Sequence, residues 1–343
     1  MKVALDAMGG DFAPKNTVVG AAMALKDLPH LEKLFLTGDR TRLERELAAA
    51  KCSDRRIEIV HCTEVVEMSD HAVDAVRRKK DSSVNRAVDL VKKGEADAVV
   101  SAGHTGAMVA STTIKLRTLK GVERPGIASY LPTEHNVCVL IDAGANVDAR
   151  PIHMLQYAIM GTVVSKYVLG VKNPVVGLMS IGGEDQKGSE FTKEIFKLLK
   201  ASKLNFRGNV EGHDLFENPV DVVLCDGFTG NVVLKTCEAT AKAVFNWLKR
   251  ELTANPKRTV GAMLAQNAFR AIRDKTNYET YGGSPLVGVD GVAIIAHGAS
   301  SALAIKNAIR VACESIERKI NPRIVEAIQQ FNEKVSADAV QPA

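Results

Sequence analysis

Short apolar runs rich in Val, Ile and Leu recur along the chain without the apolar–polar alternation of a strand that has one exposed face. They lie at 2–5, 34–36, 57–60, 98–100, 137–141, 175–179, 220–224 and 292–296. Helical spacing of apolar residues occupies the segments between them, as at 17–28, 82–93, 105–116, 152–169, 188–201 and 230–252. Alternation of doubly covered strands with helices predicts an α/β fold, with a three-layer, largely parallel open sheet and helices on both faces.

The segment 255–281 differs from the rest because it is basic and carries no strand signal. We predict a single α/β catalytic domain over residues 1–343, with a basic helical segment at 247–280 that projects from it. Its apolar residues recur at roughly helical spacing: Val260, Met263, Leu264, Ala268, Phe269 and Ile272. Such a helix packs against a second copy of the chain, fills the protein's own core, or lies on an anionic bilayer. We favour packing first and membrane contact next.

The composition is that of an ordinary globular protein, with 46% apolar residues, 25% charged residues and a formal charge of +5. Lys and Arg are spread along the chain, which argues against nucleic-acid binding. The six cysteines form no C-x-x-C pair and suit a reducing compartment. No apolar run approaches the length of a membrane span, and the first apolar stretch is too short for a signal peptide. We therefore expect a cytoplasmic protein that is at most peripherally bound to a membrane.

Glycine and polar residues follow almost every predicted strand. The loops are 6–11 (DAMGGD), 101–106 (SAGHTG), 142–146 (DAGAN), 180–188 (SIGGEDQKG), 225–231 (CDGFTGN) and 297–300 (HGAS). In an open α/β sheet, ligands bind beyond the carboxyl ends of the strands. A tight turn and a helix N-cap explain any one of these loops. Their recurrence at one edge predicts a shared ligand site.

Two of these loops, 101–106 and 226–231, are the leading candidates for binding phosphate, because free backbone N–H groups and the helix dipole favour an anion there. Neither fits the G-x-x-x-x-G-K-[ST] pattern, and no G-x-G-x-x-G opens the first helix, so neither a nucleotide-hydrolysing site nor a dinucleotide site is supported. Asp6, Asp142 and Asp226 each follow a strand. We favour helix capping over Mg²⁺ binding for them, and we predict neither a metal nor a cofactor.

Taken together, these loops and the Tyr281-Gly282-Gly283 motif resemble the motif series of the PlsX-type phosphate acyltransferases, in order and spacing over nearly the whole chain. Two positions depart from that series, since His104 stands where Asn is usual and Gly183 stands where Glu is usual. The resemblance implies a homodimer, acyl carrier protein as acyl donor, and a fold similar to phosphate acetyltransferases and to the isocitrate/isopropylmalate dehydrogenase group. It also implies an acyl phosphate product, which a membrane acyltransferase uses for the first acylation of glycerol-3-phosphate in phospholipid synthesis.

Attack of phosphate on a thioester needs a phosphate pocket, donors to the oxyanion and exclusion of water. A thiolate leaves readily and phosphate is already charged near neutral pH, so a general acid or base is optional. We expect Lys187, Asn231 and His297 to be catalytic. The expected phosphate- and substrate-binding residues are Asp6, Gly9, Gly10, Ser101, Gly103, His104, Thr105, Gly106, Asn146, Gly182, Asp226, Thr229 and Gly230. The densest basic run, Arg77-Arg78-Lys79-Lys80, is the candidate docking surface for the acidic carrier protein.

Three other activities remain open. A CoA-dependent phosphate acetyltransferase shares the phosphate chemistry but takes a short acyl group. A decarboxylating NAD(P)-dependent dehydrogenase is suggested by fold analogy alone, and the chain lacks the dinucleotide fingerprint. A non-catalytic scaffold for the carrier protein would not need the full set of glycine loops.

Overall fold

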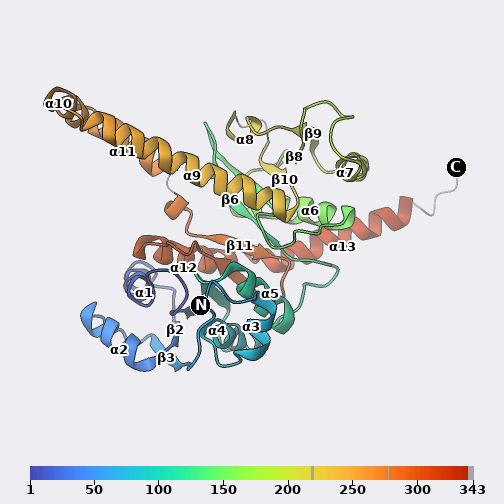
Figure 1. Ribbon diagram of the computed structural model, residues 1–343. Helices are drawn as coiled ribbons and strands as arrows, with labels where there is room; N and C mark the ends of the chain where they lie inside the picture. The colour runs from blue at the N-terminus through green and yellow to red at the C-terminus, as the bar shows by residue number, and fades with distance from the viewer. Residues whose placement is uncertain (218–219, 277, 339–343) are drawn as a thin grey trace.

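The computed structural model describes residues 1–217, 220–276 and 278–338, and its strands form two sheets (Figure 1). The first sheet has seven strands in the order β3-β2-β1-β4-β12-β11-β5. Their bounds, in that order, are Ile57–His61, Lys33–Gly38, Lys2–Asp6, Ala98–Ser101, Val292–Ile295, Ser284–Val287 and Gly126–Ile127. The strands from β3 to β12 are parallel, and β11 runs antiparallel to both of its neighbours.

The second sheet has five strands in the order β6-β7-β10-β8-β9. Their bounds are Ser129–Pro132, Val137–Ile141, Val222–Leu224, Val176–Met179 and Phe206–Val210. All pairs are parallel except β6 with β7. The predicted α/β class is confirmed, and all eight predicted strands are present, but they are divided between two sheets. The short strands β5, β6, β9 and β11 were not predicted.

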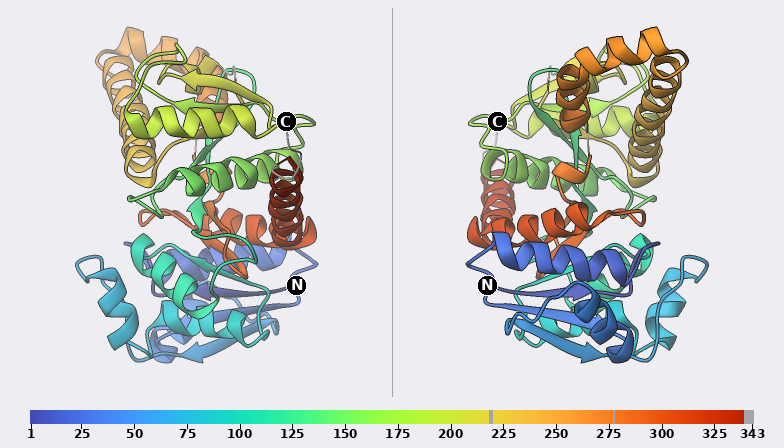
Figure 2. Two further views of the ribbon diagram at one scale, coloured as in Figure 1. Left: turned by 90° about the vertical axis from the view of Figure 1, so that its right-hand side faces the viewer. Right: turned by 90° about the vertical axis from the view of Figure 1, so that its left-hand side faces the viewer.

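Helices cover both faces of each sheet, as the doubly buried strands require (Figure 2). In the first sheet, α1 (Lys15–Asp27) and α12 (Ala302–Glu317) pack on one face, and α4 (Ser83–Lys92) and α5 (Thr105–Lys115) pack on the other. In the second sheet, α6 (Pro151–Tyr167), α7 (Glu190–Ala201) and α13 (Ile320–Asp338) cover one face. The short helices α2 (Arg40–Ala49), α3 (Ala72–Arg78) and α8 (Asp214–Glu217) lie at the periphery.

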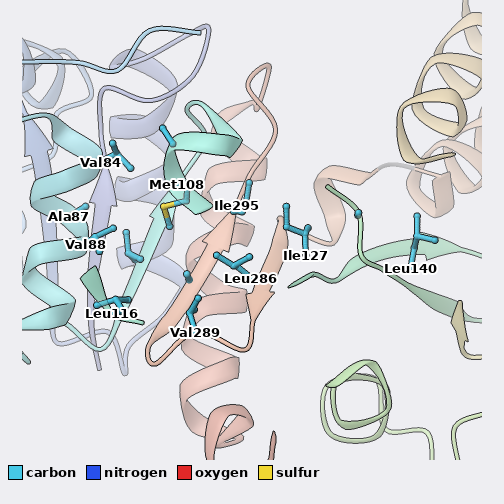
Figure 3. Packing of buried hydrophobic residues seen from close by; sticks show 14 of the residues in the cluster. Val84, Ala87, Val88, Met108, Leu116, Ile127, Leu140, Leu286, Val289 and Ile295 are labelled. Carbon is cyan, nitrogen blue, oxygen red and sulfur yellow. The ribbon is translucent and has the colours of Figure 1, made fainter. Parts of the chain in front are cut away.

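One buried apolar cluster connects the two sheets (Figure 3). It runs from Val84 on α4 and Met108 on α5, through Leu286 on β11 and Ile127 on β5, to Leu140 on β7. Strands β5 and β6 are consecutive in the chain and belong to different sheets, so the chain passes between the sheets at this point. The loops at the carboxyl ends of both sheets are therefore carried by one continuously packed body.

The long helix α9 (Gly227–Leu252) runs out from the second sheet and returns through α10 (Pro256–Leu264), α11 (Gln266–Thr276) and the 3₁₀ turn η1 (Tyr278–Thr280). The outer half of α9, with α10 and α11, extends away from both sheets (Figure 1); Asn277 of the predicted segment lies outside the described residues. Val260, Met263 and Leu264 are exposed, the last of them by 85%. The alternative that these residues fill the protein's own core is therefore wrong. No helix within the described ranges is long and apolar enough to cross a membrane.

Candidate functional site

Three loops leave the first sheet at the same level, because the strands that precede them are in register. Asp6 at the end of β1 pairs with Ser101 at the end of β4, and Ser101 pairs with Ile295 at the end of β12. The loops that follow each strand, at 7–11, 102–104 and 296–301, consequently meet at one edge of the sheet.

Backbone contacts hold these three loops together. The N–H of Asp11 donates to the carbonyl of Gly298 at 2.8 Å. A Cβ added at Gly9 would lie 2.8 Å from the nitrogen of Gly103, and one at Gly10 would lie 3.1 Å from the carbonyl oxygen of Gly298. Gly10 also has a φ of +110°, which disfavours other residues. The glycines thus allow the backbones to approach closely, which brings Gly9, Gly10 and Gly103 of the predicted site to one place.

Beneath these loops lies the buried carboxyl group of Asp6. Ser101 Oγ donates to Asp6 Oδ2 at 2.7 Å and accepts from the N–H of Gly103 at 3.1 Å. Asp6 Oδ1 is buried without a hydrogen-bond partner in the described structure. Burial raises the pKa of Asp6, because an ionised carboxylate loses its hydration there. The hydrogen bonds of Ser101 thus connect the carboxyl group of Asp6 to the backbone of the 102–104 loop.

The loop after β4 opens α5 and presents free donors. His104 is the N-cap residue, and its Nδ1 accepts from the N–H of Ala107 at 3.2 Å. In the described structure, the N–H groups of Thr105 and Gly106 have no acceptor, as is usual in the first turn of a helix. A helix N-terminus with free N–H groups favours an anion. The ring of His104 therefore organises the turn, and the backbone beside it is available to phosphate.

The corresponding loop of the second sheet is built around Asp142. Its carboxylate accepts from the N–H groups of Ile127 at 2.8 Å, Ala145 at 2.9 Å and Asn146 at 2.7 Å. It also accepts from Gly144 at 3.1 Å. With its oxygens engaged by these backbone donors, Asp142 shapes the 142–146 loop. The predicted helix capping is wrong for Asp142 and Asp6, because the N-cap residues of the helices that follow them are Arg150 and Pro14.

The first turn of α9 packs directly on that loop. Asp226 caps the helix, accepting from the N–H of Thr229 at 2.9 Å and from Thr229 Oγ1 at 2.7 Å. A Cβ added at Gly227 would lie 2.7 Å from the carbonyl oxygen of Asn146, and one at Gly230 would lie 1.9 Å from that of Asp142. Because the Asp226 carboxylate already accepts from the N–H and the hydroxyl of Thr229, the N-terminus of α9 is a weaker anion-binding site than that of α5. Of the two leading phosphate loops, the structure favours 101–106.

Two asparagines of the predicted site lie next to this packing. Asn146 Nδ2 donates to the hydroxyl of Tyr157 at 3.1 Å, which fixes the amide. The side chain of Asn231 lies against Gly144, where an added Cβ would be 3.4 Å from Asn231 Cβ. Asn231 is exposed, so its amide is accessible to a ligand.

His297 lies where α9 crosses the loops of the first sheet. Its Nδ1 accepts from the N–H of Ala299 at 3.1 Å, and its Nε2 lies 3.7 Å from Glu238 Oε2 on α9. These two residues border a cavity of about 70 Å³ that Tyr281 and Gly282 also line. Sequence reasoning missed Glu238. Its spacing was a usable signal, because Glu238 follows Asn231 by two helical turns and lies on the same face of α9.

Lys187 and Gly182 lie on the 180–189 loop between β8 and α7, apart from the three first-sheet loops. The loop is held by Asn209 Nδ2, which donates to the carbonyl of Glu184 at 2.8 Å. Lys187 is exposed, and its ammonium has no hydrogen bond or ion pair within the described part of the chain. The structure therefore does not join Lys187 to His297, and its catalytic role stays a prediction.

The basic run 77–80 ends α3. Arg77, Arg78 and Lys80 are exposed, whereas Lys79 Nζ donates to Asp70 Oδ2 at 2.6 Å. The start of α3 lies beside the phosphate loop, since a Cβ added at Gly106 would be 3.1 Å from Ala72 Cβ. The accessible cations lie at the opposite, C-terminal end of α3 from Ala72.

Comparison with known proteins shows the family to which the chain belongs. The family described as "Fatty acid synthesis protein" matches residues 1–323. The chain is 53% identical over 337 residues to a phosphate acyltransferase from Akkermansia muciniphila, covering 96% of this chain and 97% of that protein. It is 46% identical over 334 residues to one from Pelotomaculum thermopropionicum, covering 97% of each. The chain belongs to the phosphate acyltransferase family. It is accordingly an acyltransferase, as the loop motifs predicted.

Solved structures share the fold of this family member at low identity. A phosphotransacetylase from Streptococcus pyogenes is 18% identical with a TM-score of 0.61, covering 92% of this chain and 94% of that one. A branched-chain phosphotransacylase from Enterococcus faecalis is 14% identical with a TM-score of 0.52, covering 92% and 99%. The expected likeness of fold to phosphate acetyltransferases is confirmed.

Proposed function

We propose that this phosphate acyltransferase transfers a fatty acyl group from acyl carrier protein to inorganic phosphate. The observation that carries the proposal is the convergence of the β1, β4 and β12 loops beside the uncapped N–H groups of Thr105 and Gly106. Those groups suit an anion of the size of phosphate. The relatives are themselves named phosphate acyltransferases.

The reaction is a direct displacement. A phosphate oxygen attacks the thioester carbonyl carbon, a C–O bond forms, and the carbonyl oxygen becomes an oxyanion. Collapse of this intermediate breaks the C–S bond, and the electron pair leaves with sulfur as a thiolate. His297 and Asn231 supply donors to the oxyanion or the phosphate, and Lys187 supplies positive charge when its loop moves over the substrate.

Acyl carrier protein is the proposed donor because it is acidic and α3, whose first residue contacts the phosphate loop, carries exposed cations at its far end. Arg77, Arg78 and Lys80 are exposed and available for an acidic partner. Lys79 is tied to Asp70 and holds the turn that presents them. In this proposal, a carrier docked on this surface delivers its acyl group to the loops that bind phosphate.

The projecting helices support a further proposal about partners. Exposed Val260, Met263 and Leu264 on α10 suit a second copy of the chain in a homodimer or an anionic membrane surface. The acyl phosphate is a reactive apolar product that a membrane acyltransferase consumes for the first acylation of glycerol-3-phosphate. A cytoplasmic enzyme that touches the membrane delivers it without release into water.

One assay tests the function. The protein is incubated with phosphate and, separately, palmitoyl carrier protein, palmitoyl-CoA, acetyl-CoA or NAD with a hydroxy acid, and acyl phosphate is detected by mass spectrometry. We expect palmitoyl phosphate from the carrier protein at the highest kcat/KM. Acetyl phosphate from acetyl-CoA as the main product would identify a CoA-dependent phosphate acetyltransferase instead. Binding of the carrier without any acyl phosphate would identify a scaffold.

A further inference from the structure

A second, larger cavity lies under the 180–189 loop, away from His297. Its volume is about 310 Å³, compared with about 70 Å³ for the cavity at His297. A water molecule takes about 30 Å³ in the liquid, so the larger cavity has room for a sizeable organic group. It also reaches the lower end of the range for small-molecule pockets. None of the predicted catalytic residues lines it.

Large apolar side chains form much of the wall of this cavity. Met154 of α6, Leu178 and Met179 of β8, and Phe191 and Ile195 of α7 supply them. Leu178 and Ile195 belong to the core of the second sheet, so the cavity opens into well-packed hydrophobic structure. Walls of this kind favour a hydrocarbon over any charged ligand.

Apart from Ser180 Oγ, which is buried without a hydrogen-bond partner in the described structure, the polar side chains at the cavity are largely engaged with neighbours. Ser189 caps α7 and accepts from the N–H of Thr192 at 3.2 Å. The carboxylate of Asp226 accepts from both the N–H and the hydroxyl of Thr229. Asp226 is the charged residue of the lining, and its partners are supplied by its own helix turn. A ligand entering here meets exposed hydrocarbon, and Asp226 and Thr229 already have partners.

One large apolar side chain of the lining is exposed to solvent. Ile181, which lines the cavity, is 82% exposed. Single exposed apolar residues are common on proteins. Here the residue belongs to the cavity wall, so a hydrocarbon chain entering the cavity would cover it.

Helix α9 connects this cavity to the reaction site. Asp226 and Thr229 in its first turn line the larger cavity, and Glu238 lines the smaller one beside His297. Nine residues separate Thr229 from Glu238, which is about 14 Å along a helix. An acetyl group at the reaction site cannot reach the larger cavity, but the tail of a long acyl chain can.

We propose that the cavity lined by Met154, Leu178, Met179, Phe191 and Ile195 binds the distal part of a linear fatty acyl chain and thereby selects long-chain donors. The inference rests on the proposed function, because it assigns the tail of that substrate to a separate subsite. The occupant is a hydrocarbon tail, and its carbonyl end stays near His297.

Ser180→Phe is the direct test. Ser180 lines the cavity, and its Oγ is buried without a hydrogen-bond partner in the described structure, so the substitution fills space and breaks no hydrogen bond. Each buried methylene contributes about fourfold in affinity, so excluding several of them lowers kcat/KM for palmitoyl carrier protein by at least about tenfold. Activity with hexanoyl carrier protein stays within about twofold of wild type, on the same reasoning. Leu198→Phe is the matched control, because Leu198 lies on α7 outside the cavity and is already 37% exposed.

Binding of cis-parinaric acid, measured by its fluorescence, gives a second readout that does not need catalysis. We expect saturable binding to the wild type and to Leu198→Phe, and at least about tenfold weaker binding to Ser180→Phe. If Ser180→Phe fails to fold by its melting curve, Thr192→Phe at the same cavity replaces it. Equal loss for palmitoyl and hexanoyl donors, or no loss for either, overturns the subsite. If the wild-type protein binds the probe but forms no acyl phosphate from any donor, the proposed function is wrong. The cavity is then tested by the difference in probe binding between wild type and Ser180→Phe alone.

Discussion

The contact between the first turn of α9 and the 142–146 loop can be tested with a single methyl group. In Gly230→Ala, the added Cβ would lie 1.9 Å from the carbonyl oxygen of Asp142 and 2.8 Å from Cys225 Sγ. Ordinary contact begins at 3.4 Å, so the gap must open by the difference of about 1.5 Å. The obstacle is a backbone carbonyl, which cannot rotate away as a side chain can.

The displacement therefore passes to α9 or to the 142–146 loop. Overpacking of this kind costs roughly 1–3 kcal/mol in the free energy of unfolding. A shift of about 1 Å in positioning groups lowers the rate by on the order of 10²-fold. Asn231 follows Gly230 directly, so we expect the variant to lose turnover by about that factor even when it is fully folded.

Gly212→Ala is the matched control, because a Cβ there meets no atom within 4 Å. Its free energy of unfolding should stay within about 0.5 kcal/mol of wild type, with unchanged turnover. Urea unfolding followed by circular dichroism gives the stability, and palmitoyl phosphate formation at saturating substrates gives kcat. A folded Gly230→Ala protein with wild-type kcat would refute the view that this turn positions the site.

Three further changes test other parts of the site. Burial raises the pKa of Asp6 above 3.8, so ionisation of this carboxyl group destabilises the folded wild type increasingly as the pH rises above 3.8. Asp6→Asn removes the carboxyl group and with it this destabilisation. Its gain in Tm over wild type should shrink as the pH falls towards 3.8, and a gain independent of pH would contradict this. The triple change Arg77→Glu, Arg78→Glu and Lys80→Glu should raise KM for the carrier protein by about tenfold or more and leave KM for phosphate unchanged. The effect on KM for the carrier protein should be smaller at high salt. Equal effects on both KM values would exclude these residues as the docking surface. Lys187→Ala should lower kcat by on the order of 10²-fold with unaltered unfolding, and normal turnover would remove Lys187 from the mechanism.

The strands that were predicted from sequence are those with unbroken apolar runs, such as Val137–Ile141. The missed strands lack such a run. β5 has two residues, β6 and β11 contain Pro132 and Pro285, and β9 contains Gly208 and Asn209. The apolar pattern of a strand indicates that both of its faces are covered, but it does not indicate which strand lies next to it in the sheet. The division into two sheets could therefore not be predicted from the sequence.

In the candidate site, too, local features were predictable from the sequence and contacts between distant segments were not. Parallel strands share their carboxyl edge, and the register of Asp6 with Ser101 confirms the predicted meeting of loops in the first sheet. The prediction of one edge for all six loops was wrong, because the loops after β7, β8 and β10 belong to the second sheet. Helical spacing places Glu238 on the same face of α9 as Asn231, but its approach to His297 also depends on the path of α9 across the molecule. Helical spacing predicted an apolar face on α10 but not what covers it, and Leu264 proved exposed.

The most direct test of the account is to locate the bound anion. Crystals of the protein soaked with tungstate, a heavy analogue of phosphate, would reveal its position by anomalous scattering. We predict the anion at the N–H groups of Thr105 and Gly106, beside Gly10 and Gly103. Tungstate bound elsewhere in the protein, with these loops empty at a saturating concentration, would contradict the claim that the glycine loops of the first sheet hold the phosphate.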